Sequence, residues 1–400
     1  MLKLSKRFLR KVVWNHTILV SGDLLTGERI RRLLESRKIE STPWLRFQNI
    51  VFVMGLFHLK MACVDAIWRI FISKEGMAAV SDKNSLLSHA AQLRPKETGK
   101  LVSKPGFRRM HEIIRHVGIV SRLDWWRLAV AELGFSSLDT FAASKPTMEM
   151  LESIAAKLVG KHLQNGDDVL RLRRQGNGER DKVHENVLVR NFYFLLYEEL
   201  SYAMDIGDIG RVESSFPQWA GIFQGCGKHK YAAELVRYIE DVHYRYPPSL
   251  RNAIQMNILQ NPLGKAGHFR AIDWIVEHNN LYIKRIYAGQ FSNRTPEYLM
   301  KQSALIEVFK SIRIQLEDWF CFNVKNSHHS PPKLLETFAK LSAHLLEHQT
   351  NEFINGRTTA YSIPDIMGQG LATLATNQTP KEMPEEDISG GEITGDDLAA

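Results

Sequence analysis

Asp23 is the acidic residue whose position in the sequence most clearly indicates a ligand-binding or metal-binding site. It follows an apolar run at residues 17–20 and comes just before residues 24–34, whose apolar side chains have helical spacing. In α/β proteins, a carboxylate at the carboxyl end of a buried strand faces the ligand or metal that binds there. The structural alternative is that Asp23 caps the following helix or forms a Gly-Asp turn.

A second pair of carboxylates, Asp273 and Glu277, is spaced four residues apart. On a helix this spacing places both on one face, where they repel unless a cation, a metal or a hydrogen-bond donor lies between them. The alternative is that both are solvated, or that Arg270 and Lys284 neutralise them.

His58 is the histidine that we retain as a candidate metal ligand. It lies just past the apolar part of a predicted strand over residues 50–58, which Gly55 could end or kink, and it is expected on the same side of the sheet as Asp23. The other histidines show no ligand spacing. The alternative for His58 is a packed histidine that makes a structural hydrogen bond.

Basic residues gather in three stretches that could follow a phosphate backbone. A solvated protein surface is the alternative for each stretch taken alone. The candidate nucleic-acid-binding residues are Arg29, Arg31, Arg32, Lys104, Arg108, Arg109, Arg171, Arg173 and Arg174.

The elements that must position these residues are few. Strands at 17–23 and 50–58, joined by a helix at 28–37, predict a βαβ unit with parallel strands and a right-handed crossover. From residue 107 onward the periodicity is helical almost throughout, over 107–117, 121–133, 147–163, 183–205, 209–223, 228–245, 248–259, 270–278, 296–320 and 333–349.

This pattern divides the chain into seven segments. They are a basic N-terminal segment (1–16), a βαβ element (17–71), a basic loop region with one helix near 86–93 (72–106), a helical insertion domain (107–260), a helical return with C-terminal helices (261–350), an irregular segment (351–377) and an acidic, disordered tail (378–400).

Composition favours an intracellular protein with a polyanionic partner. The 400 residues carry a net charge of +8. Residues 381–400 contribute −6 of it, which leaves +14 on residues 1–380, an excess that suits nucleic acid. Three widely spaced cysteines predict thiols in a reducing compartment, and no membrane segment is expected. The chain also lacks a Walker loop, a Gly-x-Ser-x-Gly elbow and a dinucleotide fingerprint.

Several motifs resemble a family of uncharacterised fungal proteins, the domain of unknown function six-five-eight-nine. The resemblance is carried in family order, from about residue 18 to residue 317, by Gly22-Asp23-Leu24-Leu25-Thr26, Gly55-Leu56-Phe57-His58, Gly207-Asp208-Ile209-Gly210, Tyr246-Pro247-Pro248 and the segment 273–280. This resemblance implies a transposon-related protein, without an assigned activity.

The layout is also similar to that of transposases with an RNase H-like core. Asp23 matches the second catalytic Asp of such cores, and Glu277 matches the Glu that follows a long helical insertion; 254 residues separate them. The chain looks truncated at its start, because the hairpin that carries the first Asp is missing. A complete site of this kind binds two metal ions.

The resemblance therefore implies a predominantly α fold with a small α/β element, an incomplete RNase H-like core interrupted by a large helical insertion. It implies catalytic residues Asp23 and Glu277, and ligands for Mg²⁺ or Mn²⁺ from Asp23, Glu277, His58 and Asp273. We expect a nuclear, DNA-binding protein with weak or no strand-transfer or nuclease activity. The alternative is a helical protein-interaction scaffold without nucleic-acid binding or catalysis.

Overall fold

Two short parallel strands open the part of the chain that the structure describes. The structure is a computed structural model, and it describes residues 16–73, 82–103, 105–163, 166–176, 178–286, 295–303, 305–320, 334–360 and 362–376. Strand β1 (Ile18–Gly22) pairs in parallel with β2 (Ile50–Met54), with Ile18 opposite Ile50 and Gly22 opposite Met54. Helix α2 (Leu24–Ser36) connects them, which confirms the predicted βαβ unit.

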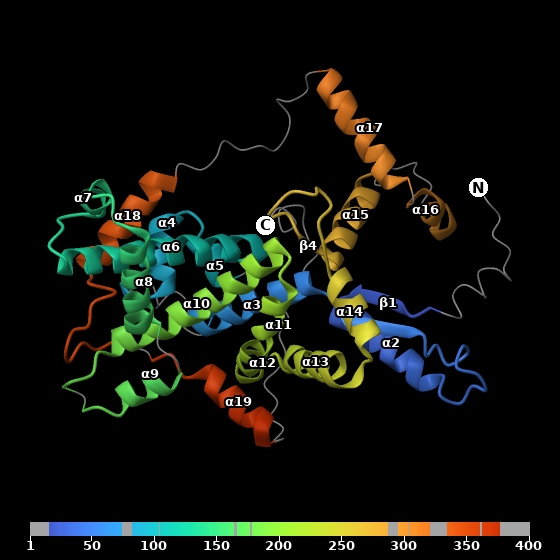
Figure 1. Cartoon of the computed structure of the whole chain (residues 1–400), viewed down its shortest axis with the longest axis horizontal. Helices are drawn as coiled ribbons and strands as arrows, with labels where there is room; N and C mark the ends of the chain where they lie inside the picture. The colour runs from blue at the N-terminus through green and yellow to red at the C-terminus, as the bar shows by residue number, and fades with distance from the viewer. Residues whose placement is uncertain are drawn as a thin grey trace.

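The rest of the described chain is mainly helical, as predicted (Figure 1). Its helices are α3 (Leu56–Trp68), α4 (Leu86–Leu93), α5 (Thr98–Ser103), α6 (Phe107–Glu132), α7 (Leu138–Ala143), α8 (Met148–His162), α9 (Gly166–Arg173), α10 (Lys182–Ile206), α11 (Ile209–Ser214), α12 (Phe216–Gly225), α13 (His229–Ile239), α14 (Pro248–Asn257), α15 (Ile272–Ile286), α16 (Pro296–Ser303), α17 (Ile306–Trp319), α18 (Leu334–Glu347) and α19 (Ile366–Thr376).

Smaller elements complete the described chain. The π-helical segments η1 (Arg69–Ser73) and η3 (Glu240–Arg245) extend α3 and α13. Strands β3 (Leu259–Gln260) and β4 (Arg270–Ala271) form a short antiparallel pair that leads directly into α15.

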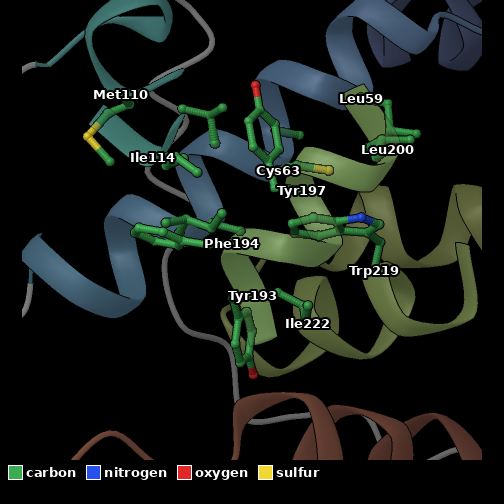
Figure 2. Packing of buried hydrophobic residues seen from close by; sticks show 14 of the residues in the cluster. Leu59, Cys63, Met110, Ile114, Tyr193, Phe194, Tyr197, Leu200, Trp219 and Ile222 are labelled. Carbon is green, nitrogen blue, oxygen red and sulfur yellow. The ribbon is translucent and has the colours of Figure 1, made fainter. Parts of the chain in front are cut away.

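Helix α3 lies at the centre of the molecule because it is apolar around most of its circumference. Ten of its thirteen residues are buried, as expected for a helix surrounded by other helices. Helices α6, α10 and α12 pack around it. Figure 2 shows Cys63 of α3 among Phe194 and Tyr197 of α10 and Trp219 of α12.

The C-terminal helices pack back onto this core. Helix α18 lies against α4 and α6, and α19 lies along α12. The approach of α19 to α12 is close because Gly370 faces Gly221 and Gly225; a Cβ at Gly370 would collide with the Gly221 carbonyl oxygen and lie 2.7 Å from the Gly225 nitrogen. A buried ion pair between Asp181 and Arg357, with 2.7 Å between Oδ2 and Nη2, fixes the segment between the two helices.

The structure departs from the sequence prediction at several places. The predicted helices 107–117 and 121–133 form the single helix α6, and the predicted helices 209–223 and 296–320 are each divided into two. Three further departures concern the core and the site. The predicted strand 50–58 ends at Met54, and α3 begins at Leu56. The predicted loop region 72–106 contains α5 in addition to α4. The segment 351–377 is not irregular throughout, since residues 366–376 form α19, whose small residues permit close packing on α12. The basic N-terminal residues 1–15 and the tail 378–400 lie outside the described residues.

Candidate functional site

Asp23, His58, Asp273 and Glu277 lie around the point where β1 and β2 end. Asp23 directly follows β1, and His58 is in the first turn of α3, just after β2. Asp273 is in the first turn of α15, and Glu277 follows one helical turn later. The charges of all three carboxylates act on the His58 ring. The fold thus gathers residues that are far apart in the sequence.

Asp273 supplies the N-terminal cap of α3 from a distant part of the chain. Its Oδ1 accepts the backbone N–H of Phe57 at 3.1 Å, and its Oδ2 accepts that of His58 at 3.1 Å. Gly55, the residue at the N-cap position, makes no side-chain cap bond. An anionic acceptor suits the positive end of a helix, so the Asp273 carboxylate satisfies two amides that α3 cannot satisfy itself.

Gly55 makes room for this cap. Its backbone is extended, with φ −70° and ψ 123°, so its role here is not conformational freedom. A Cβ at this position would instead collide with the Asp273 carboxylate. In the Gly-Leu-Phe-His motif, Gly55 therefore leaves space for the Asp273 carboxylate, and the amides of Phe57 and His58 donate hydrogen bonds to it.

His58 is held by the same carboxylate. Its Nδ1 lies 2.9 Å from Asp273 Oδ2. An ionised carboxylate only accepts hydrogen bonds, so Nδ1 carries the proton and Nε2 is the atom that can gain or lose one. Burial alone would lower the pKa of His58. The hydrogen bond and charge of Asp273, with the charges of Asp23 and Glu277, outweigh burial and raise this pKa above its ordinary value.

Asp23 caps α2, as its structural alternative proposed. Its Oδ1 accepts the Thr26 backbone N–H at 2.8 Å. Burial opposes ionisation of Asp23, but the hydrogen bonds from Thr26 lower its pKa. The nearby positive charges of His58 and Arg29 act in the same direction, and the net pKa is below the ordinary value.

The structure also decides between the alternatives for Asp273, the first of the two α15 carboxylates. Asp273 is 2% exposed, so the solvated alternative is wrong for this residue. Arg270 does not neutralise it: its Nη1 lies 3.3 Å from Asp205 Oδ1, and its guanidinium stacks over the Trp274 ring. The backbone amides of α3 and His58 are the groups that compensate the Asp273 charge.

This arrangement does not fit a metal ion as it stands. Three hydrogen bonds occupy the two oxygens of Asp273, and one oxygen of Asp23 is committed to α2. Among the residues that the structure describes, no three His, Cys, Asp or Glu side chains form a group that could hold a metal. Metal binding by Asp23, His58, Asp273 and Glu277 stays a prediction, and the geometry favours hydrogen bonding in its place.

The predicted nucleic-acid-binding residues have varied surroundings. Arg29, Arg32, Arg171 and Arg174 are exposed. Several others form ion pairs within the chain: Arg31 with Glu234, Arg108 with Glu112 at 2.9 Å, Arg109 with Glu97 at 3.0 Å and Arg173 with Glu185 at 3.4 Å. Lys104 lies outside the described residues. Helices α2 and α9 lie toward opposite ends of the long axis, so their arginines form separate surfaces (Figure 1).

Lys60 is a neighbour of the site that the sequence pattern did not identify as a candidate. Lys60 of α3 is 6% exposed and lines a cavity of about 20 Å³ with Phe57, Asp205 and Trp274. Burial is the main cause that lowers the pKa of Lys60 to about 8. Periodicity could not reveal it, because this lysine occupies a buried position on a helix that is buried on nearly all sides.

Comparisons with known proteins place the chain in a family. None of the helices in the described ranges combines the length and apolar character needed to cross a bilayer. No curated protein matches the chain, and no solved structure matches it. One family model matches residues 2–329, which is most of the sequence. The chain belongs to this family, the family of unknown function DUF6589.

Proposed function

We propose that this chain is a transposon-derived nucleic-acid-binding protein whose transposase-like site is degenerate. The observation that supports the proposal is that Asp23 and His58 follow two parallel strands, and that Glu277 is on α15, the helix that packs against β1 and α3. This arrangement is similar to the layout of an RNase H-like core. The long helical segment between Asp23 and Glu277 has the place of the insertion in such transposases.

The α2 helix is the binding surface that we propose. Arg29 and Arg32 are exposed on it, and it starts at Asp23, so a phosphate backbone held there would pass beside the site. The paired Arg31 is less suitable, because it contacts Glu234 and lies over the Phe52 ring at 5.4 Å. Contacts to phosphate position a nucleic acid without reading its sequence.

We propose no catalysis because two of the three carboxylates, Asp23 and Asp273, are already engaged in hydrogen bonds. Asp273 is committed to the N-terminus of α3 and to His58, and Asp23 is committed to α2. We infer that Asp23 and Asp273 stabilise the N-termini of α2 and α3 beside the binding surface and do not hold a metal ion.

A mobility shift of duplex DNA at low and at raised ionic strength tests the binding proposal. We expect retardation by the wild type at low salt that weakens steeply as salt rises, because bound phosphates release counterions. The Arg29→Glu/Arg32→Glu variant should bind more weakly. If it loses two phosphate contacts, the slope of log K against log salt should become shallower by about 1.8.

The matched control reverses two exposed lysines far from α2, Lys145 and Lys157, and changes the net charge by the same amount. We expect the Lys145→Glu/Lys157→Glu variant to keep most of the affinity. Equal loss in both variants would show that net charge, and not the α2 surface, governs binding.

A protein-interaction scaffold is the second candidate. It is favoured by the ion pairs of Arg31, Arg108, Arg109 and Arg173, which already neutralise many of the basic residues. No retardation of any DNA or RNA at low salt would reject the first proposal and support the scaffold.

A further inference from the structure

Helix α17 carries an apolar stripe on its exposed surface. Five residues of α17 and of the turn before it share the stripe, at alternating spacings of four and three: Leu305, Phe309, Ile312, Leu316 and Trp319. Their exposed fractions run from 37% for Phe309 to 77% for Trp319. Soluble monomers rarely expose such a contiguous apolar surface, and a patch of this kind commonly marks an interaction site.

The rest of α17 is anchored to the molecule. Its main packing partner in the described chain is α15. Ile306 is 4% exposed, and the Lys310 ammonium lies 5.6 Å from the centre of the Tyr282 ring of α15. Figure 1 shows α17, in orange, at the edge of the molecule and away from the central helices. The stripe is therefore held in place without being used for the chain's own core.

The spacing indicates what kind of structure covers the stripe. Apolar residues that alternate by four and three correspond to positions d and a of a heptad, whose seam packs against another helix in a left-handed coiled coil. A sheet or an extended peptide would not match this period. The partner that the spacing specifies is a helix with the same repeat.

We propose that α17 pairs with the α17 of a second copy of this chain. Val308 and Phe320, which are 50% and 63% exposed, widen the stripe on both sides. Burial of these seven apolar side chains would remove on the order of 700 Å² per copy from water, close to the roughly 800 Å² per partner of a stable interface. Identical helices satisfy the heptad requirement without any additional partner.

The pairing has a consequence for the candidate site. Since α17 packs on α15, and α15 carries Asp273 and Glu277, the dimer would connect two copies of the site through their α15 helices. The dimer proposal does not depend on nucleic-acid binding and is tested without it.

Sedimentation equilibrium of the full chain over a range of concentrations tests the proposal. We expect the wild type to approach twice the monomer mass and the Ile312→Glu/Leu316→Glu variant to weaken dimerisation by more than about tenfold. Both residues are exposed in the single chain, with fractions of 48% and 42%, so the variant should keep its helical circular dichroism.

Two controls sharpen the result. Ser311→Glu adds a charge to α17 outside the stripe, and Met256→Glu removes a 78% exposed apolar side chain from α14. Both should remain dimeric. A wild type that is monomeric at every concentration, or a stripe variant that dimerises as tightly as the wild type, would overturn the proposal. The milder Ile312→Ala/Leu316→Ala variant repeats the test if the glutamates disturb folding.

Discussion

At the scale of single residues, Asp273 has the central position, because one carboxylate serves three donors. It joins the N-terminus of α3, the ring of His58 and the start of α15. Removal of one buried partner leaves the others without a hydrogen bond, and this costs more than the bond itself contributed. The effect of substitution should therefore be larger than for an ordinary helix cap.

Asp273→Ala should destabilise the protein by about 2–4 kcal/mol, because it removes a cap and leaves the amides of Phe57 and His58 unsatisfied. Urea denaturation of wild type and variant measures this change in the free energy of unfolding. The control is Asp139→Ala, which removes an exposed first-turn acid of α7 and should cost less than about 0.5 kcal/mol. Similar costs for both variants would argue against the cap.

The raised pKa of His58 predicts a pH dependence with a definite sign. The folded state binds the His58 proton more tightly than the unfolded state, so this contribution to stability is fully present below the ordinary pKa of 6.5. It is lost as pH rises through the folded pKa. The stability difference between wild type and His58→Gln should therefore be larger near pH 6 than near pH 8.5.

Denaturation of both proteins across this pH range makes the comparison, and the other titrating groups largely cancel in the difference. A difference that is constant, or that grows with pH, would show that His58 does not gain a proton on folding.

At the scale of elements, the local residue pattern predicted the helices and strands whose structure depends mainly on their own sequence. The apolar, β-branched residues 18–20 and 50–53 predicted both strands, and the helical periodicity located α8, α10 and α18 within a few residues. The start of α3 was missed, because a capping group 216 positions from Phe57 makes helix possible directly after Gly55.

Helix α19 was missed for a related reason. Its sequence contains Gly368 and Gly370, and glycines weaken an isolated helix. Close packing of Gly370 on α12 compensates, and such tertiary contact cannot be read from local sequence. The candidate site was predictable as a set of residue types and spacings. The sequence could not predict that the backbone amides of α3 donate hydrogen bonds to Asp273, because these bonds depend on how α15 packs against α3.

Gly370→Ala should destabilise the protein by about 1–3 kcal/mol, because the added methyl group forces α19 away from α12. Gly160→Ala is the matched control: Gly160 lies in α8, and a Cβ there meets nothing within 4 Å. That control should stabilise by about 0.5–1 kcal/mol through helix propensity. Thermal unfolding of both variants measures the contrast. Stabilisation by both would show that α19 does not need close contact with α12.

At the scale of the whole molecule, the net positive charge does not by itself locate a nucleic-acid-binding surface. Residues 1–380 carry an excess of +14, but many of the arginines that contribute to it are paired with acids. The exposed arginines of α2 adjoin the candidate site, whereas those of α9 lie at the other end of the molecule (Figure 1). A nucleic acid bound at α2 would therefore lie beside the candidate site, whereas one bound at α9 would not.

The degenerate state of the site is tested most directly by a duplex-DNA cleavage assay with Mg²⁺ or Mn²⁺, in which wild type is compared with Asp23→Ala and Glu277→Ala. We expect no cleavage or strand transfer by the wild type under conditions in which the DNA is bound, because Asp23 and Asp273 cap helix N-termini. Metal-dependent cleavage by the wild type that either substitution abolishes would show that the site is complete and active, and not degenerate.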